Sequence, residues 1–150
     1  MSVELHSNTQ AVSAELQRKT RTALYVIGNV VLEHAVEAIS GTYTPDNLAV
    51  DTGRLRASLS YVTPFGEVKG KSPTAGPVQP GDRLEEPCED NTVVIGTNVE
   101  YAEFVHNGTV KMRARPFLTE GVQTAAPRIE ELLNAILGED NYTIEGVDIV

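Results

Sequence analysis

Three side chains in one short stretch of the sequence could act as acids and bases. Glu100, Glu103 and His106 are spaced three residues apart, which places them on one face of a helix. A hydrolase would also need a nucleophile or a metal ion, and an oxyanion site. Ser58 and Ser60 lack the Gly-x-Ser-x-Gly turn that exposes a nucleophilic serine. We therefore predict no catalytic residues and no enzyme activity.

The other reactive side chains do not form a recognisable site either. Cys88 is the only cysteine, so the chain has no intrachain disulfide, and its acidic neighbours should raise the thiol pKa. None of His6, His34 and His106 has a second ligand three or four residues away that completes a metal set, whereas zinc or iron needs three or four converging ligands. We predict no metal site and no cofactor.

A Gly-Lys-Ser sequence at residues 70–72 is similar to the end of a phosphate-binding P-loop. The first glycine of that motif would fall at Phe65, so the spacing fails. No buried parallel strand is expected before it, so we attribute the match to chance.

Composition limits the class of protein. The 150 residues suit one domain, and its core must be built from Val, Leu, Ile and Ala because there is no Trp and aromatic residues make up only 5%. A net charge of −9 disfavours non-specific binding to nucleic acid or to an anionic membrane. The negative charge does not exclude that the protein forms the wall of a channel through which DNA passes without sequence-specific binding.

We also expect a soluble protein that is made in a cytoplasm and binds no membrane. Residues 1–10 lack the basic start and apolar run of a secretory signal. No uninterrupted apolar run approaches the roughly 18 residues that span a bilayer.

Basic residues gather in two places outside the first predicted helix. Arg54 and Arg56 form one group, and Lys111, Arg113 and Arg115 form the other. The acidic surroundings and the scarcity of aromatic residues disfavour a nucleic-acid site. Two interpretations stay open: solvated surface charge, or arginines that pair with carboxylates across a subunit interface.

Apolar periodicity predicts one long helix over residues 9–40, which ends near Gly41 and Pro45. Gly28 inside it indicates a bend or a close contact. The helix would be roughly 48 Å long at 1.5 Å per residue, longer than a compact domain of this size is wide. Its N-terminal part therefore either rests on a neighbouring subunit or frays.

Strands are predicted at residues 59–63 and 92–97, with a short helix at 99–106 and a third strand at 112–115. A final helix should start at Phe117, with Pro127 causing a kink or a division into two helices. Five of the eight prolines lie in residues 64–91, for which we expect a projecting arm with a mobile tip. Residues 142–150 alternate weakly, so the tail is either loose or added to a neighbour's sheet.

Together these elements predict a single α+β domain over residues 1–150. It would hold a long N-terminal helix, a small and mostly antiparallel sheet, and a C-terminal helix packed on that sheet. The flexible parts would be the Pro/Gly-rich arm at about 64–91 and a C-terminal tail at about 139–150.

Three short motifs in a fixed order resemble a family of tailed-bacteriophage neck proteins, also called head–tail joining or tail-completion proteins. The resemblance runs from about Val12 to Leu137. The first motif reads Val-Asp-Thr-Gly-x-Leu-x-x-Ser from Val50, the second reads Tyr-Ala-x-x-Val-x-x-Gly-Thr from Tyr101, and the third reads Ala-x-Pro-Phe-Leu from Ala114. His106 departs from the acidic residue common in the second motif.

Each motif has a physical role that fits a fold determinant. Asp51 or Thr52 could cap a helical turn, and Gly53 allows tight backbone geometry there. Tyr101 and Phe104 should cover the sheet, and Gly108 permits a left-handed exit from the helix. Pro116 starts the last helix and Phe117 anchors it. The candidate fold and interface residues are Asp51, Thr52, Gly53, Arg54, Leu55, Tyr101, Phe104, Gly108, Thr109, Arg115, Pro116 and Phe117.

The resemblance implies a structural protein of the virion, located at the head–tail interface and assembled as a ring around the DNA channel. It implies six copies rather than twelve, because tail tubes are six-fold. The implied partners are other neck proteins, head-completion or adaptor proteins, and tail-terminator or tail-tube proteins. The alternative is an acidic, non-enzymatic protein-binding or regulatory module.

Overall fold

The computed structural model describes residues 1–6, 14–40, 53–65, 70–137 and 147–149. Its centre is a five-stranded sheet in the order β3-β2-β4-β1-β5, in which every pairing is antiparallel. The strands are β1 (Ser2–His6), β2 (Ser60–Val62), β3 (Gly70–Lys71), β4 (Thr92–Gly96) and β5 (Val147–Ile149). The α+β class is confirmed.

One row of side chains shows which face of the sheet is covered by helices. Val3 lies opposite Ile95, and Ile95 lies opposite Tyr61, so the three side chains point to the same side. All three are buried in the main hydrophobic cluster. Glu4, Val94 and Val62 form the next row and point to the other side, because side chains alternate along a strand.

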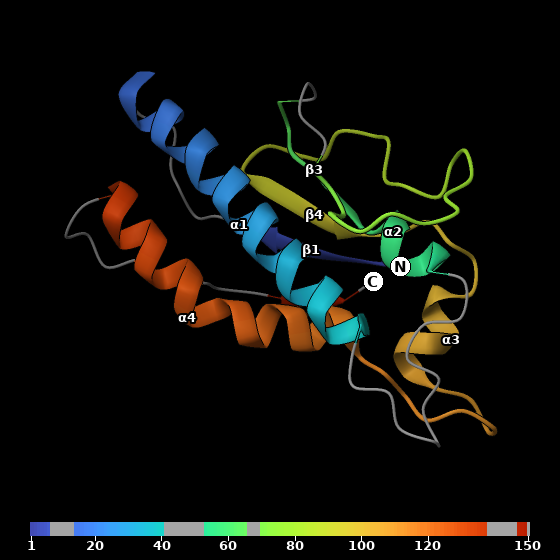
Figure 1. Cartoon of the computed structure of the whole chain (residues 1–150). Coiled ribbons are helices and arrows are strands. Elements are labelled where there is room, and N and C mark those ends of the chain that lie inside the picture. Colours follow the sequence, from blue (N-terminus) through green and yellow to red (C-terminus); the bar gives the residue numbers. More distant parts are fainter. Residues whose placement is uncertain (7–13, 41–52, 66–69, 138–146, 150) are drawn as a thin grey trace.

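Two long helices cover the Val3–Ile95–Tyr61 face. These are α1 (Ala14–Ser40) and α4 (Phe117–Leu137), which lie side by side in Figure 1. A Cβ atom on Gly121 would lie 2.9 Å from the backbone of Ala35, so glycine allows the two helices to approach closely. A Cβ on Gly28 would meet the Tyr61 ring at 2.5 Å, which confirms the close contact expected at that glycine.

Two predicted details concern the start of the first long helix, which the described residues do not test, and Pro127 in the last one. The helix predicted from residue 9 is described from Ala14 onward, and residues 7–13 lie outside the described part. Pro127 does not divide α4 into two helices, because α4 continues through it to Leu137. Buried Ala125, Ile129 and Leu133 hold both sides of the proline in the core, which offsets the hydrogen bond it removes.

One stretch of α1, Gln17–Ser40, is long and apolar enough to cross a membrane when judged by length and composition alone. Half of this stretch is buried inside the molecule, and core helices of soluble proteins pass the same test. The expectation that the protein binds no membrane therefore stays a prediction.

The expected projecting arm is corrected, because its described part is anchored along the body. β3 pairs with β2, and the Ser72 backbone N–H donates to the Leu59 carbonyl over 2.9 Å. The Leu84 N–H donates to Ser60 Oγ over 3.0 Å, and the Cys88 thiol lies 3.0 Å from the Thr92 carbonyl. Residues 66–69 lie outside the described part, and the flexibility of the segment stays a prediction.

Three smaller elements also differ from the prediction. β1 was not predicted, and it is an interior strand of the sheet, between β4 and β5. β5 pairs with β1 of the same chain rather than remaining loose or joining a neighbour's sheet. Residues 112–115 form no strand, because Thr109 and Met112 close a tight turn there. The short helices are α2 (Arg54–Ser58) and α3 (Ala102–Asn107).

Candidate functional site

The first motif places a short helix directly after a glycine with a positive φ. Gly53 has φ 77° and ψ 0°, a left-handed conformation that favours glycine, and its carbonyl accepts a 2.9 Å hydrogen bond from Ala57 N–H. Leu55, on the first turn of α2, is buried in the core. The predicted caps Asp51 and Thr52 lie outside the described residues.

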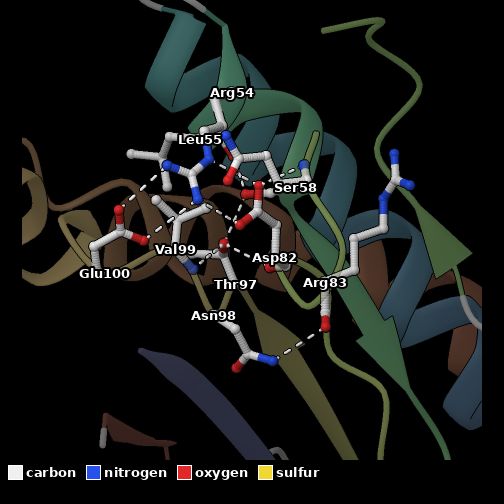
Figure 2. A network of polar contacts seen from close by, with 10 residues as sticks. Arg54, Leu55, Ser58, Asp82, Arg83, Thr97, Asn98, Val99 and Glu100 are labelled. Atoms are coloured by element: carbon white, nitrogen blue, oxygen red, sulfur yellow. Dashed lines mark hydrogen bonds and ion pairs between the residues drawn. The ribbon is translucent and has the colours of Figure 1, made fainter. Parts of the chain in front are cut away.

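Arg54 is the centre of a polar junction shown in Figure 2. Its guanidinium donates two parallel hydrogen bonds to the Asp82 carboxylate, from Nε to Oδ2 at 2.8 Å and from Nη2 to Oδ1 at 2.7 Å. Nη1 also donates to Glu100 over 3.2 Å. The Arg54 Cζ atom lies 5.9 Å from the centre of the Tyr101 ring. Two interpretations of Arg54 were open, solvated surface charge or pairing across a subunit interface, and the carboxylates that it contacts here belong to its own chain.

The two carboxylates of the junction differ in their surroundings. The Asp82 side chain is 5% exposed, whereas the Glu100 side chain is 73% exposed. The hydrogen bonds from Arg54 lower the Asp82 pKa to about 2, against the opposing effect of burial. The Glu100 pKa is lowered by a backbone hydrogen bond and by Arg54. Asp82 is therefore the tightly held partner, and Glu100 is the one open to solvent.

Two buried hydroxyl groups connect the junction to the sheet. Ser58 Oγ donates to the Leu55 carbonyl over 2.7 Å and lies 2.6 Å from Thr97 Oγ1. The Asp82 carbonyl accepts hydrogen bonds from Asn98 N–H at 2.8 Å and from Thr97 Oγ1 at 3.2 Å. Both hydroxyl side chains are fully buried. The junction thus ties together α2, the 70–91 segment and the end of β4.

The second and third motifs form a corner between α3 and α4. Phe117 is buried, which confirms it as an anchor, and its ring meets the His106 ring edge-on with centroids 5.4 Å apart. His106 is also buried. Tyr101 packs partly against the core, but Phe104 is 58% exposed, so the expectation that both cover the sheet is wrong for Phe104.

A tight turn joins the two motifs, and backbone and side-chain hydrogen bonds hold it in place. Gly108 has φ 78°, and a Cβ there would lie 2.7 Å from the Ala114 backbone nitrogen. Thr109 N–H donates to the Met112 carbonyl over 2.8 Å. Arg115 N–H donates to the Val105 carbonyl over 2.9 Å, and its guanidinium donates to Ile39 O at the end of α1 over 2.6 Å. The Pro116 carbonyl accepts from Glu120 N–H in the first turn of α4.

No local pattern in the sequence indicated Asp82, the most important partner in the junction. Asp82 follows Pro80 and Gly81, a pattern typical of a turn, and nothing local pairs it with an arginine 28 residues earlier. Thr97 closes a strand and carried no expected role. Both act through contacts that are distant in sequence.

Several side chains that were considered as possible catalytic or metal-binding groups make other contacts in the described structure. Glu100 is bound to Arg54, and His106 lies 3.0 Å from Asn107 Oδ1 in a buried corner. Burial is the largest cause of the raised Cys88 pKa, and the charges of Glu4 and Glu89 add to it, in the direction expected from its acidic neighbours. Among the described residues, no three His, Cys, Asp or Glu side chains could hold a metal ion together.

Comparison with known proteins identifies the class of protein. The model of the family described as "Bacteriophage HK97-gp10, putative tail-component" matches residues 4–108. The match covers 105 of the 150 residues, so the chain belongs to the HK97-gp10-like family of bacteriophage tail components. It includes the Arg54 junction and α3, and it ends before the third motif. Neither a search of curated proteins nor a search of solved structures found a match.

The family confirms the resemblance to tailed-phage neck and tail-completion proteins. The chain is a structural protein of a bacteriophage virion, and its partners are other virion proteins.

Proposed function

We propose that this protein forms part of the head–tail connector, or neck, that joins the DNA-filled head to the tail. In this role identical copies form a closed ring around the DNA channel, and the ring adjoins other neck, head-completion or adaptor, and tail-terminator or tail-tube proteins. A hexamer is favoured over a dodecamer because tail tubes are six-fold.

One structural observation supports this proposal in addition to the family assignment. All the large apolar side chains that are exposed in the described structure, Phe104, Val110 and Met112, fall within residues 104–112. Exposed apolar surface that is concentrated on one part of a protein often marks a protein contact. The surrounding backbone is held by hydrogen bonds, so the segment is a prepared contact surface.

The chemistry of the surface supports assembly rather than turnover. The junction carboxylates are held by Arg54, and the net charge of −9 lets DNA pass without sequence-specific binding. The role requires no cofactor and no metal. A closed ring of identical chains needs two different patches on each copy, one of which meets the other on the next copy.

Negative-stain imaging of tail tubes mixed with the purified protein tests this role. We expect ring-shaped density on one end of the tubes, and free rings of the same diameter in the background. Tubes that stay bare at every protein concentration would contradict the neck assignment. They would favour the alternative of an acidic protein-binding module that acts elsewhere.

A further inference from the structure

The turn at residues 108–113 presents two apolar and two basic side chains to solvent. Val110 is fully exposed and Met112 is 38% exposed, and they alternate with exposed Lys111 and Arg113. No ion pair among the described residues involves either cation. This surface is unusual for a chain with a net charge of −9.

The backbone of this turn is held in one conformation by hydrogen bonds. Thr109 and Met112 exchange two backbone hydrogen bonds, of 2.8 and 3.3 Å, and Thr109 Oγ1 accepts from the N–H groups of Lys111 and Met112. In Figure 1 the turn, in light orange, extends beyond α3 and away from strands β1 and β4. A prepared turn loses little conformational entropy when it binds.

A groove of complementary character lies on the opposite face of the sheet from α1 and α4. Its volume is about 480 Å³, within the range of clefts that hold ligands or side chains. The floor is the row Glu4–Val94–Val62, and the wall is the 84–89 segment. We call it the acidic groove because Glu4, Glu85, Glu86 and Glu89 line it.

The groove has a mixed character that matches the turn. Leu84 and Val94 supply half-buried apolar surface, and no Lys or Arg is among its lining residues. Glu86 and Glu89 are exposed at the wall, where an approaching cation would meet them. An apolar centre with charges at its edge is the usual composition of a protein contact.

We infer that the 108–113 turn of one copy docks in the acidic groove of the next copy. Val110 and Met112 would lie against Leu84 and Val94, while Lys111 and Arg113 would meet the carboxylates of the wall. The turn and the groove belong to different parts of the chain, so the contact runs head to tail, as a closed ring requires. This inference rests on the proposed ring and names the surfaces that build it.

Charge reversal on each side tests the contact. The turn variant carries Lys111→Glu and Arg113→Glu, and the groove variant carries Glu86→Lys and Glu89→Lys. Each variant alone should place like charges together and raise the dissociation constant for self-association by roughly a hundredfold. Mixed one to one, the variants should form rings of alternating copies, because every turn then faces a groove of opposite charge. An even-numbered ring such as a hexamer can close in this way.

A matched control separates this contact from general charge effects. Lys71→Glu with Arg128→Glu changes two exposed residues and shifts the net charge from −9 to −13, as the turn variant does. It should assemble like the wild type. At a concentration below the assembly threshold, thermal melting of every variant should match the wild type, since all the changed residues are exposed.

The outcomes distinguish this contact from the ring itself. A wild type that forms rings, together with a turn variant that forms them equally well or a mixture that fails to restore them, would overturn the contact alone. A wild type that stays monomeric, free and with tail tubes, would overturn the ring and the contact with it.

Discussion

The Arg54 junction and the 108–113 turn use the same kinds of side chain in opposite ways. In the junction, a guanidinium is bound by two carboxylates of its own chain, and the nearer carboxylate is only 5% exposed. In the turn, Lys111 and Arg113 are exposed and alternate with two exposed apolar side chains. The junction therefore fixes the fold, whereas the turn is available to another molecule. Changes in the junction should alter stability, and changes in the turn should alter assembly.

The largest expected effect on stability comes from removing the buried carboxylate of the junction. Asp82→Ala leaves the Arg54 fork without its main acceptor, and we expect the free energy of unfolding to fall by about 2 kcal/mol. For a chain of this size that corresponds to a fall of about 6 °C in Tm, measured by circular dichroism. Asp90→Ala, an exposed residue in the same segment, is the matched control and should leave Tm unchanged. Equal effects at both positions would show that the junction is not structural.

Acid should abolish the contribution of Asp82 to the free energy of unfolding. The pKa of Asp82 is about 2 in the folded protein and 3.8 in its ordinary state, so its stabilising effect is complete above pH 3.8 and disappears as the pH falls toward 2. The difference in unfolding free energy between wild type and Asp82→Asn should follow this course in denaturant titrations. A difference that persists unchanged at pH 2 would contradict the assigned pairing.

A smaller effect is expected at the glycine that begins α2. Gly53→Ala puts a side chain at φ 77° and should cost about 1 kcal/mol. Gly53→Asn should cost less, because asparagine tolerates the left-handed region better than other residues with a side chain. Urea denaturation of the wild type and the two variants measures the order of their unfolding free energies. An alanine variant as stable as the wild type would show that the tight geometry is not required.

The smallest effect on stability should come from the turn. Val110→Ser removes an apolar side chain that contacts solvent, so the free energy of unfolding should change by no more than about 0.5 kcal/mol. The same substitution should weaken self-association in sedimentation experiments, because the apolar contact is lost. A variant that melts much earlier, yet assembles normally, would reverse the roles given to the two regions.

The sequence was informative where the signal is local. The apolar period over residues 9–40 predicted the helix that is described as α1 from Ala14 to Ser40, and the β-branched run predicted β4, since each pattern repeats within one segment. Gly53 and Gly108 were predicted from motifs that need unusual backbone angles, and both have positive φ. The anchoring role of Phe117 followed from its place at the start of an apolar helix.

The sequence failed where a contact joins distant segments. β1 is stabilised by pairing with β4 and β5, which lie far along the chain, so five residues at the N-terminus carried little signal of their own. Asp82 and Arg54 meet only because the 70–91 segment is tied to the sheet. Phe104 and Phe117 stand in similar motifs, and only the packing shows that one faces solvent and the other the core.

The mass of the purified protein in solution, measured by light scattering over a range of concentrations, tests the central claim most directly. Six copies of the 16.2 kDa chain weigh about 97 kDa, and the ring account predicts a species of that mass which stays constant above a threshold concentration. A constant 16.2 kDa at every concentration would contradict a protein that forms a ring by itself.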